Sequence, residues 1–110
     1  MNFMFTDFIT SLPVEKEYIG NLYFPVQEVL SSQDEIKQRK ADAERGSFLG
    51  NGYKSKVLIY FKDIEGLKHV ETTIWAVTDK RVILKNNVTI PLHRIIRVKA
   101  EEESLKYPNI

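Results

Sequence analysis

Cysteine is absent from this 110-residue chain, and histidine occurs only twice. The lack of cysteine excludes disulfide frameworks, cysteine-ligated zinc, iron–sulfur clusters and thiol catalysis, and it fits a reducing cytoplasm. No apolar stretch approaches the roughly 20 residues that span a bilayer. No Lys or Arg precedes the apolar N-terminal residues, so the pattern of a signal peptide is missing. We therefore expect one cytoplasmic domain over residues 1–110.

The net charge of +1 conceals an uneven distribution along the chain. Residues 1–50 contain five Lys/Arg and eight Asp/Glu, whereas residues 51–100 contain ten and four. Residues 101–110 contain one Lys and three Glu. A basic central region attracts phosphate, but acidic flanks neutralise the same charge within the molecule.

Apolar and polar residues alternate from Val70 to Lys99, with breaks only at turn residues. This period of two predicts antiparallel strands with one buried face. Asparagine pairs tolerate the positive φ values of tight hairpins, so Asn86-Asn87 predicts a turn. The meander over residues 54–100 is predicted to contain strands at Lys54–Lys62, Lys68–Thr78, Arg81–Lys85, Val88–Leu92 and Ile95–Val98.

Residues 1–46 are predicted to be mainly helical. Apolar residues up to Leu12 follow helical spacing, and Pro13 should end that first helix. An irregular segment with a short strand at Tyr18–Phe24 comes next. Ser32-Gln33-Asp34-Glu35 then has the pattern of a capping box, and Gly46 supplies a helix stop. The expected fold is α+β, with N-terminal helices packed on a five-stranded antiparallel meander or small barrel.

The segment Thr78-Asp79-Lys80-Arg81-Val82-Ile83-Leu84, followed by Ile90-Pro91-Leu92-His93-Arg94-Ile95, resembles bacterial pleckstrin-homology-like domains. The helix and five short strands also resemble SH3-like or Sm-like barrels. The full pattern, including Leu49-Gly50-Asn51 and Val70-Glu71-Thr72-Thr73-Ile74-Trp75, is similar to short uncharacterised bacterial proteins. A small barrel usually bends its long strand at a glycine or a bulge. Lys68–Thr78 contains no glycine, so the choice between these closures stays open.

No catalytic, cofactor or metal constellation is found in the sequence. Gly50, Gly52, Lys54 and Ser55 only approximate a phosphate loop, which needs a contiguous Gly-Lys-Ser/Thr after a strand. His69 and His93 would need to meet a carboxylate such as Glu71 to form an acid–base or metal site, and nothing in the pattern requires that. We therefore expect a protein that is not an enzyme and has no cofactor.

Basic residues of the predicted sheet are the first candidates for ligand binding. Together with an aromatic side chain for stacking, they would form a surface for single-stranded nucleic acid. The alternative is that these charges keep an exposed sheet face solvated and protect its edge from aggregation. The candidate binding residues are Arg81, Lys85, Arg94, Arg97, Lys99 and Trp75.

An apolar stripe near the N-terminus is the second candidate surface. Membrane-surface helices usually have Lys or Arg opposite the apolar face, and here the intervening residues are acidic or neutral. Packing within a protein or between two copies is therefore favoured over membrane binding. We expect a small non-enzymatic binding or scaffolding module that acts as a monomer or as a homodimer. The alternative is a nucleic-acid-binding module. The predicted interface residues are Phe3, Phe5, Phe8, Ile9 and Leu12.

Overall fold

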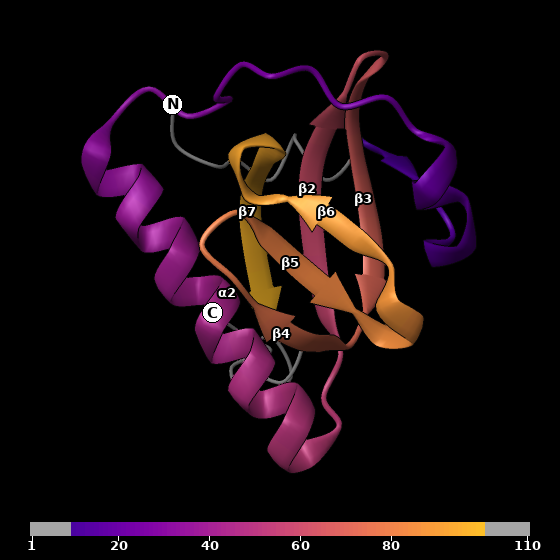
Figure 1. Cartoon of the computed structure of the whole chain (residues 1–110), viewed down its shortest axis with the longest axis vertical. Coiled ribbons are helices and arrows are strands. Elements are labelled where there is room, and N and C mark those ends of the chain that lie inside the picture. The colour runs from indigo at the N-terminus through magenta and orange to yellow at the C-terminus, as the bar shows by residue number, and fades with distance from the viewer. Residues whose placement is uncertain (1–9, 101–110) are drawn as a thin grey trace.

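The computed structural model describes residues 10–100. Its elements in chain order are β1 (Leu12–Pro13), η1 (Lys16–Asn21), α2 (Gln33–Tyr53), β2 (Val57–Asp63), β3 (Gly66–Thr72), β4 (Ile74–Val77), β5 (Arg81–Leu84), η2 (Lys85–Asn87), β6 (Thr89–Pro91), η3 (Leu92–Arg94) and β7 (Ile95–Ala100). The η elements are 3₁₀ turns. Helix α2 lies diagonally along one side of the strands and packs against β4 and β7 (Figure 1).

The strands form a four-stranded sheet in the order β1-β3-β2-β7 and a three-stranded sheet in the order β4-β5-β6. Only the short β1–β3 pair is parallel within the described residues; the other pairs are antiparallel. The predicted α+β class with antiparallel sheets is confirmed. The predicted strand over Tyr18–Phe24 is wrong, because Lys16–Asn21 forms a 3₁₀ turn.

The predicted long strand Lys68–Thr78 is interrupted at Thr73, where the chain passes from one sheet into the other. The pairing of β4 with β5 also shifts between Ile74 and Ala76, as at a β-bulge. The bend is thus made without a glycine in the strand. A glycine of the neighbouring helix allows it, because a Cβ on Gly50 would lie 2.6 Å from the Ile74 carbonyl oxygen.

Helix α2 begins as predicted but ends later. The Ser32 hydroxyl accepts a hydrogen bond from the Glu35 amide at 3.0 Å, which confirms the N-cap. The predicted stop at Gly46 is wrong, and the helix continues to Tyr53. A Cβ on Gly46 would meet side chains of the core at 3.2 Å, so this glycine allows close packing. Lys54 ends the helix in the left-handed conformation with φ 54°.

The hydrophobic core lies between the two sheets and α2. Strand β2 is central in its sheet, between β3 and β7, and apolar side chains on both of its faces are buried or partly buried. The side chain of Phe24 packs on Phe61, with ring centroids 5.9 Å apart. The core comprises Ile19, Ala43, Val57, Ile59, Phe61, Val70, Ile74, Val82, Leu84, Ile90, Leu92, Ile95, Val98 and Ala100.

Most of the predicted interface stripe, from Phe3 to Ile9, lies outside the described residues. Leu12 is 61% exposed and pairs with Lys68 in the β1–β3 ladder. Among residues 10–100, no helix combines the length and apolar character needed to cross a bilayer.

Candidate functional site

The predicted basic residues are divided among separate parts of the surface. Arg81 lines a cleft beside α2, and Lys85 lines another cleft beside β3. Arg97 and Lys99 of β7 lie in a third place, near Asp42 and Arg45 of α2. The structure therefore does not bring the predicted set together on one sheet face.

Arg94 is placed inside the molecule, with only 7% of its surface exposed. Its Nε donates a hydrogen bond to the Lys62 carbonyl at 2.9 Å, and its Nη1 donates to the Gln27 carbonyl at 2.8 Å. These bonds hold residues 22–30 against the end of β2. Arg94 therefore has a structural role, which its charge alone did not predict.

Trp75 is 43% exposed on β4. Its carbonyl accepts a hydrogen bond from the Asn51 side chain of α2 at 3.0 Å, at the irregular step of β4. Phe48 and Tyr53 are also exposed on α2, and their rings form an edge-to-face pair with centroids 6.4 Å apart. This end of α2 presents aromatic side chains to solvent.

A charged cleft lies between α2, the β4–β5 turn and the β6–η3 segment, and we call it the α2–β5 cleft. Its volume is about 600 Å³, within the range of small-ligand sites. Its floor is apolar, with Ile36, Pro91 and the buried Leu92. The lining residues are Glu28, Ile36, Lys37, Arg39, Lys40, Asp79, Lys80, Arg81, Pro91, Leu92 and His93.

One cationic wall of this cleft is the β4–β5 turn. The Thr78 hydroxyl accepts hydrogen bonds from the amides of Lys80 and Arg81, at 3.2 and 3.0 Å. The Lys80 carbonyl accepts the Leu92 amide at 2.8 Å, which ties the turn to the cleft floor. The Thr-x-x-Arg pattern seen in the sequence therefore fixes the backbone from which Lys80 and Arg81 project.

The opposite wall is the N-terminal half of α2, which carries Lys37 and Lys40 at a helical spacing of i,i+3. The Lys40 Nζ lies 3.4 Å from a carboxylate oxygen of Asp79, so one ion pair crosses the cleft. Asp79 is 96% exposed, and an ion pair of this kind contributes little to stability. Lys37 and Lys40 were not among the predicted binding residues.

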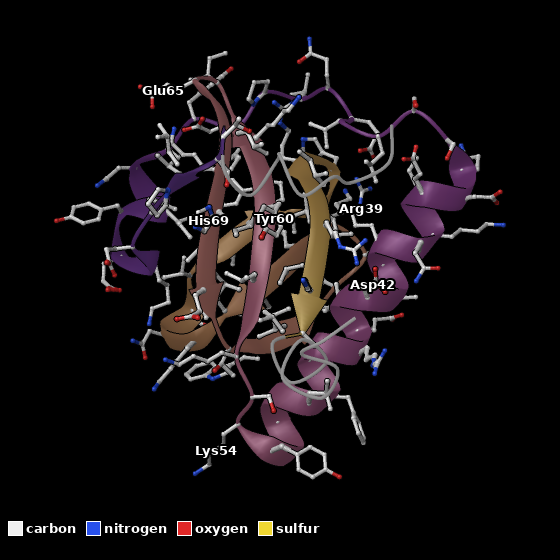
Figure 2. The ribbon with its side chains drawn as sticks, turned by 180° about the vertical axis from the view of Figure 1, so that it is seen from behind. Arg39, Asp42, Lys54, Tyr60, Glu65 and His69 are labelled. Carbon is white, nitrogen blue, oxygen red and sulfur yellow. The ribbon has the colours of Figure 1, made fainter. Side chains whose placement is uncertain are left out.

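A bidentate ion pair anchors the base of the cleft. The two terminal nitrogens of Arg39 lie 2.6 and 2.7 Å from the Glu28 carboxylate, and Nη1 also donates to the Ile95 carbonyl at 3.1 Å. Figure 2 shows Arg39 reaching from α2 toward β7. Burial raises the pKa of the Glu28 carboxyl, but the hydrogen bonds from Arg39 and Leu30 and the Arg39 charge outweigh it, so this pKa is lowered.

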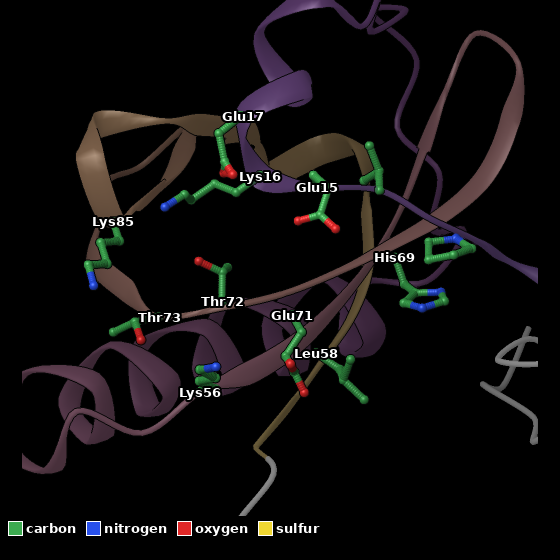
Figure 3. A pocket seen from close by; sticks show the side chains of 12 residues that line it. Glu15, Lys16, Glu17, Lys56, Leu58, His69, Glu71, Thr72, Thr73 and Lys85 are labelled. Atoms are coloured by element: carbon green, nitrogen blue, oxygen red, sulfur yellow. The ribbon is translucent and has the colours of Figure 1, made fainter.

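A second cleft of about 560 Å³ lies beside β3, and we call it the β3-edge cleft (Figure 3). It combines lysines, glutamates and hydroxyl groups. Lys85 is held at its border because its amide donates to the Thr73 carbonyl at 3.0 Å. The lining residues are Pro13, Val14, Glu15, Lys16, Glu17, Lys56, Leu58, His69, Glu71, Thr72, Thr73 and Lys85.

Both histidines have polar contacts. The Nδ1 atom of His69 lies 2.6 Å from the Ser11 hydroxyl, and its ring lies 5.8 Å from the Tyr60 ring, centroid to centroid. Figure 2 shows His69 and Tyr60 on neighbouring strands. Burial lowers the pKa of His69. His93 has its Nε2 3.0 Å from the Pro25 carbonyl. Within residues 10–100, no three His, Cys, Asp or Glu side chains are grouped to hold a metal ion.

Comparison of the chain with protein-family models, curated proteins and solved structures gives no match.

Proposed function

We propose that this protein is a non-enzymatic binding module of the cytoplasm, built on an SH3-like barrel. Three features support the barrel. β7 returns to pair with β2, β3 continues into β4 through Thr73, and η3 separates β6 from β7. Counting β3 and β4 as one bent strand turns residues 57–100 into a five-stranded meander. The bulge at Ile74–Ala76 supplies the bend that a small barrel needs.

The proposed ligand of the α2–β5 cleft is an acidic segment of a partner protein. The observation that carries this proposal is the apolar floor between two cationic walls that are distant in sequence. Lys37 and Lys40 come from α2, and Lys80 and Arg81 come from the β4–β5 turn. Carboxylates of the ligand would meet the walls, while an aliphatic side chain would cover the floor.

Nucleic-acid binding is the alternative function. Stacking on aromatic side chains is central to the binding of single strands, and the lining of the α2–β5 cleft contains no Phe, Tyr or Trp. The exposed Trp75 lies on β4, outside this lining. The acidic peptide is therefore favoured.

Fluorescence anisotropy with a labelled peptide of alternating glutamate and leucine tests the proposed function. Lys40→Gln and Arg81→Gln should each weaken binding about two- to fivefold, the range for one exposed ion pair. Arg97→Gln removes the same charge outside the cleft and should leave affinity unchanged. Equal weakening by all three variants would show nonspecific attraction. Tighter binding of an oligothymidylate of equal charge would favour the alternative function.

Self-association is a separate part of the proposal. Phe48, Tyr53 and Trp75 are exposed and belong to neighbouring elements, and Leu12 of the predicted stripe is exposed as well. Apolar side chains exposed in this way commonly mark interfaces. Light scattering over a range of protein concentrations should give the mass of a dimer, and a constant monomer mass would remove self-association from the proposal.

A further inference from the structure

The side chain of Thr72 indicates a second ligand-binding site. Thr72 is only 6% exposed, and its side chain has no hydrogen-bond partner among residues 10–100. Figure 3 shows the hydroxyl directed into the β3-edge cleft. The hydroxyl opens on the cleft, where it bonds water until a polar group of a ligand takes the place of that water. A ligand oxygen there would supply that bond.

Three lysines from separate elements line the same cleft. Lys16 belongs to η1, Lys56 precedes β2, and Lys85 begins η2. None of them has an ion pair with a residue in the described part of the chain. In Figure 3, Lys16 and Lys85 extend into the space beside Thr72 and Thr73. This end of the cleft offers positive charge and hydroxyl donors to one oxyanion.

The cleft also carries three glutamates, at Glu15, Glu17 and Glu71. Over residues 10–100 these carboxylates form no ion pair with the three lysines. Figure 3 places Glu15 toward the His69 side, away from Lys85. A simple anion would be attracted by the lysines and repelled by the glutamates. A ligand with charges of both signs avoids that repulsion.

We propose that the β3-edge cleft binds a small zwitterion that carries a phosphate group and a protonated amine. The phosphate accepts from Thr72 and lies among Lys16, Lys56 and Lys85, since its charge of about −1.5 to −2 exceeds that of one carboxylate. The amine lies toward Glu15 and Glu71. This site shares no lining residue with the α2–β5 cleft, so either binding proposal can be wrong without affecting the other.

The test titrates the full chain with O-phosphoethanolamine and follows the backbone amides by NMR. Inorganic phosphate and ethanolamine are titrated separately. The expected result is a saturable shift of the Thr72, Thr73 and Lys85 amides, with phosphate alone binding about tenfold more weakly, as for the loss of one charge-assisted contact. No shift at these amides would overturn the site. If inorganic phosphate bound as tightly as O-phosphoethanolamine, the amine would contribute nothing, and the proposal of a zwitterionic ligand would be overturned.

Two variants test the assigned contacts. Thr72→Val keeps the shape of the side chain and removes the hydroxyl, and Lys85→Gln removes one charge; each should weaken binding by about five- to tenfold. Lys99→Gln, on β7 outside the cleft, should have no effect. The amide spectrum of each variant verifies the fold. Unchanged affinity in a folded Thr72→Val protein, or equal weakening by Lys99→Gln, would overturn the proposed site.

Discussion

Gly50 of α2 lies against Ile74 of β4 so closely that a Cβ atom on Gly50 would come within 2.6 Å of the Ile74 carbonyl oxygen and 2.9 Å of the Thr73 side chain. The contact falls where the chain leaves one sheet and enters the other. Backbone cannot yield as a flexible side chain does. The bend at Thr73 and the path of α2 therefore depend on each other.

Replacing Gly50 with alanine should destabilise the protein. The added methyl group forces helix and strand apart, and overpacking of this kind costs up to about 3 kcal/mol. Because the clash is with the Ile74 backbone, we expect this cost to exceed the gain in helix propensity of about 1 kcal/mol. Gly52→Ala is the matched control, because a Cβ on Gly52 would meet no atom of the described residues within 4 Å. Urea denaturation should show loss of stability for Gly50→Ala only. Equal stability of the two variants would refute the close contact.

Lys54→Gly should stabilise the protein. Lys54 ends α2 with φ 54°, a left-handed conformation that costs a residue with a Cβ about 1–2 kcal/mol. Glycine removes that strain but adds entropy to the unfolded chain, so we expect a net gain of about 0.5–1 kcal/mol in the free energy of unfolding. Lys54→Ala removes the same charge and should give no gain. A gain shared by both variants would assign the effect to charge.

The ion pair between Glu28 and Arg39 should make stability depend on acid pH. The pKa of Glu28 is lowered in the folded protein, so its contribution is present above the ordinary value of 4.5 and is lost as the pH falls through the lowered pKa. At neutral pH, Glu28→Gln should cost about 1–2 kcal/mol. Thermal melts at descending pH should bring the variant and the parent together. A constant difference across that range would contradict the assignment.

Asp79→Asn should strengthen the binding of the glutamate–leucine peptide. The carboxylate of Asp79 lies 3.4 Å from the Lys40 Nζ and competes with carboxylates of a ligand. Removing it should raise affinity about twofold, as expected for an exposed ion pair. Asp42→Asn makes the same change in net charge on α2 and outside the lining of the α2–β5 cleft. If both variants gained equally, Asp79 would have no local role.

The features that were predicted correctly from the sequence are those set by residues adjacent in the chain. Ser32 caps α2, and Asn86 and Asn87 both adopt positive φ, because short polar side chains favour those local geometries. The stop at Gly46 was wrong because that glycine is required by contacts with Ile74 and Val57, which come from other elements. Spacing along one chain does not show such contacts.

The sites were predictable to a smaller extent. Arg81 and Lys85 do line clefts, but Arg94 is buried because carbonyls 67 and 32 residues away accept its hydrogen bonds. The sequence did contain one further signal, the pair Lys37 and Lys40, at one-turn spacing on a predicted helix. Their meeting with the β4–β5 turn depends on how α2 packs, which the sequence pattern did not determine.

The most direct test of the α2–β5 cleft maps the glutamate–leucine peptide onto the protein by amide chemical shifts. The predicted result is a set of saturable shifts at Lys37, Lys40, Lys80 and Arg81, with Arg97 and Lys99 unmoved. Shifts centred on Arg97 and Lys99, or no saturable shifts at the cleft, would contradict the proposed binding module.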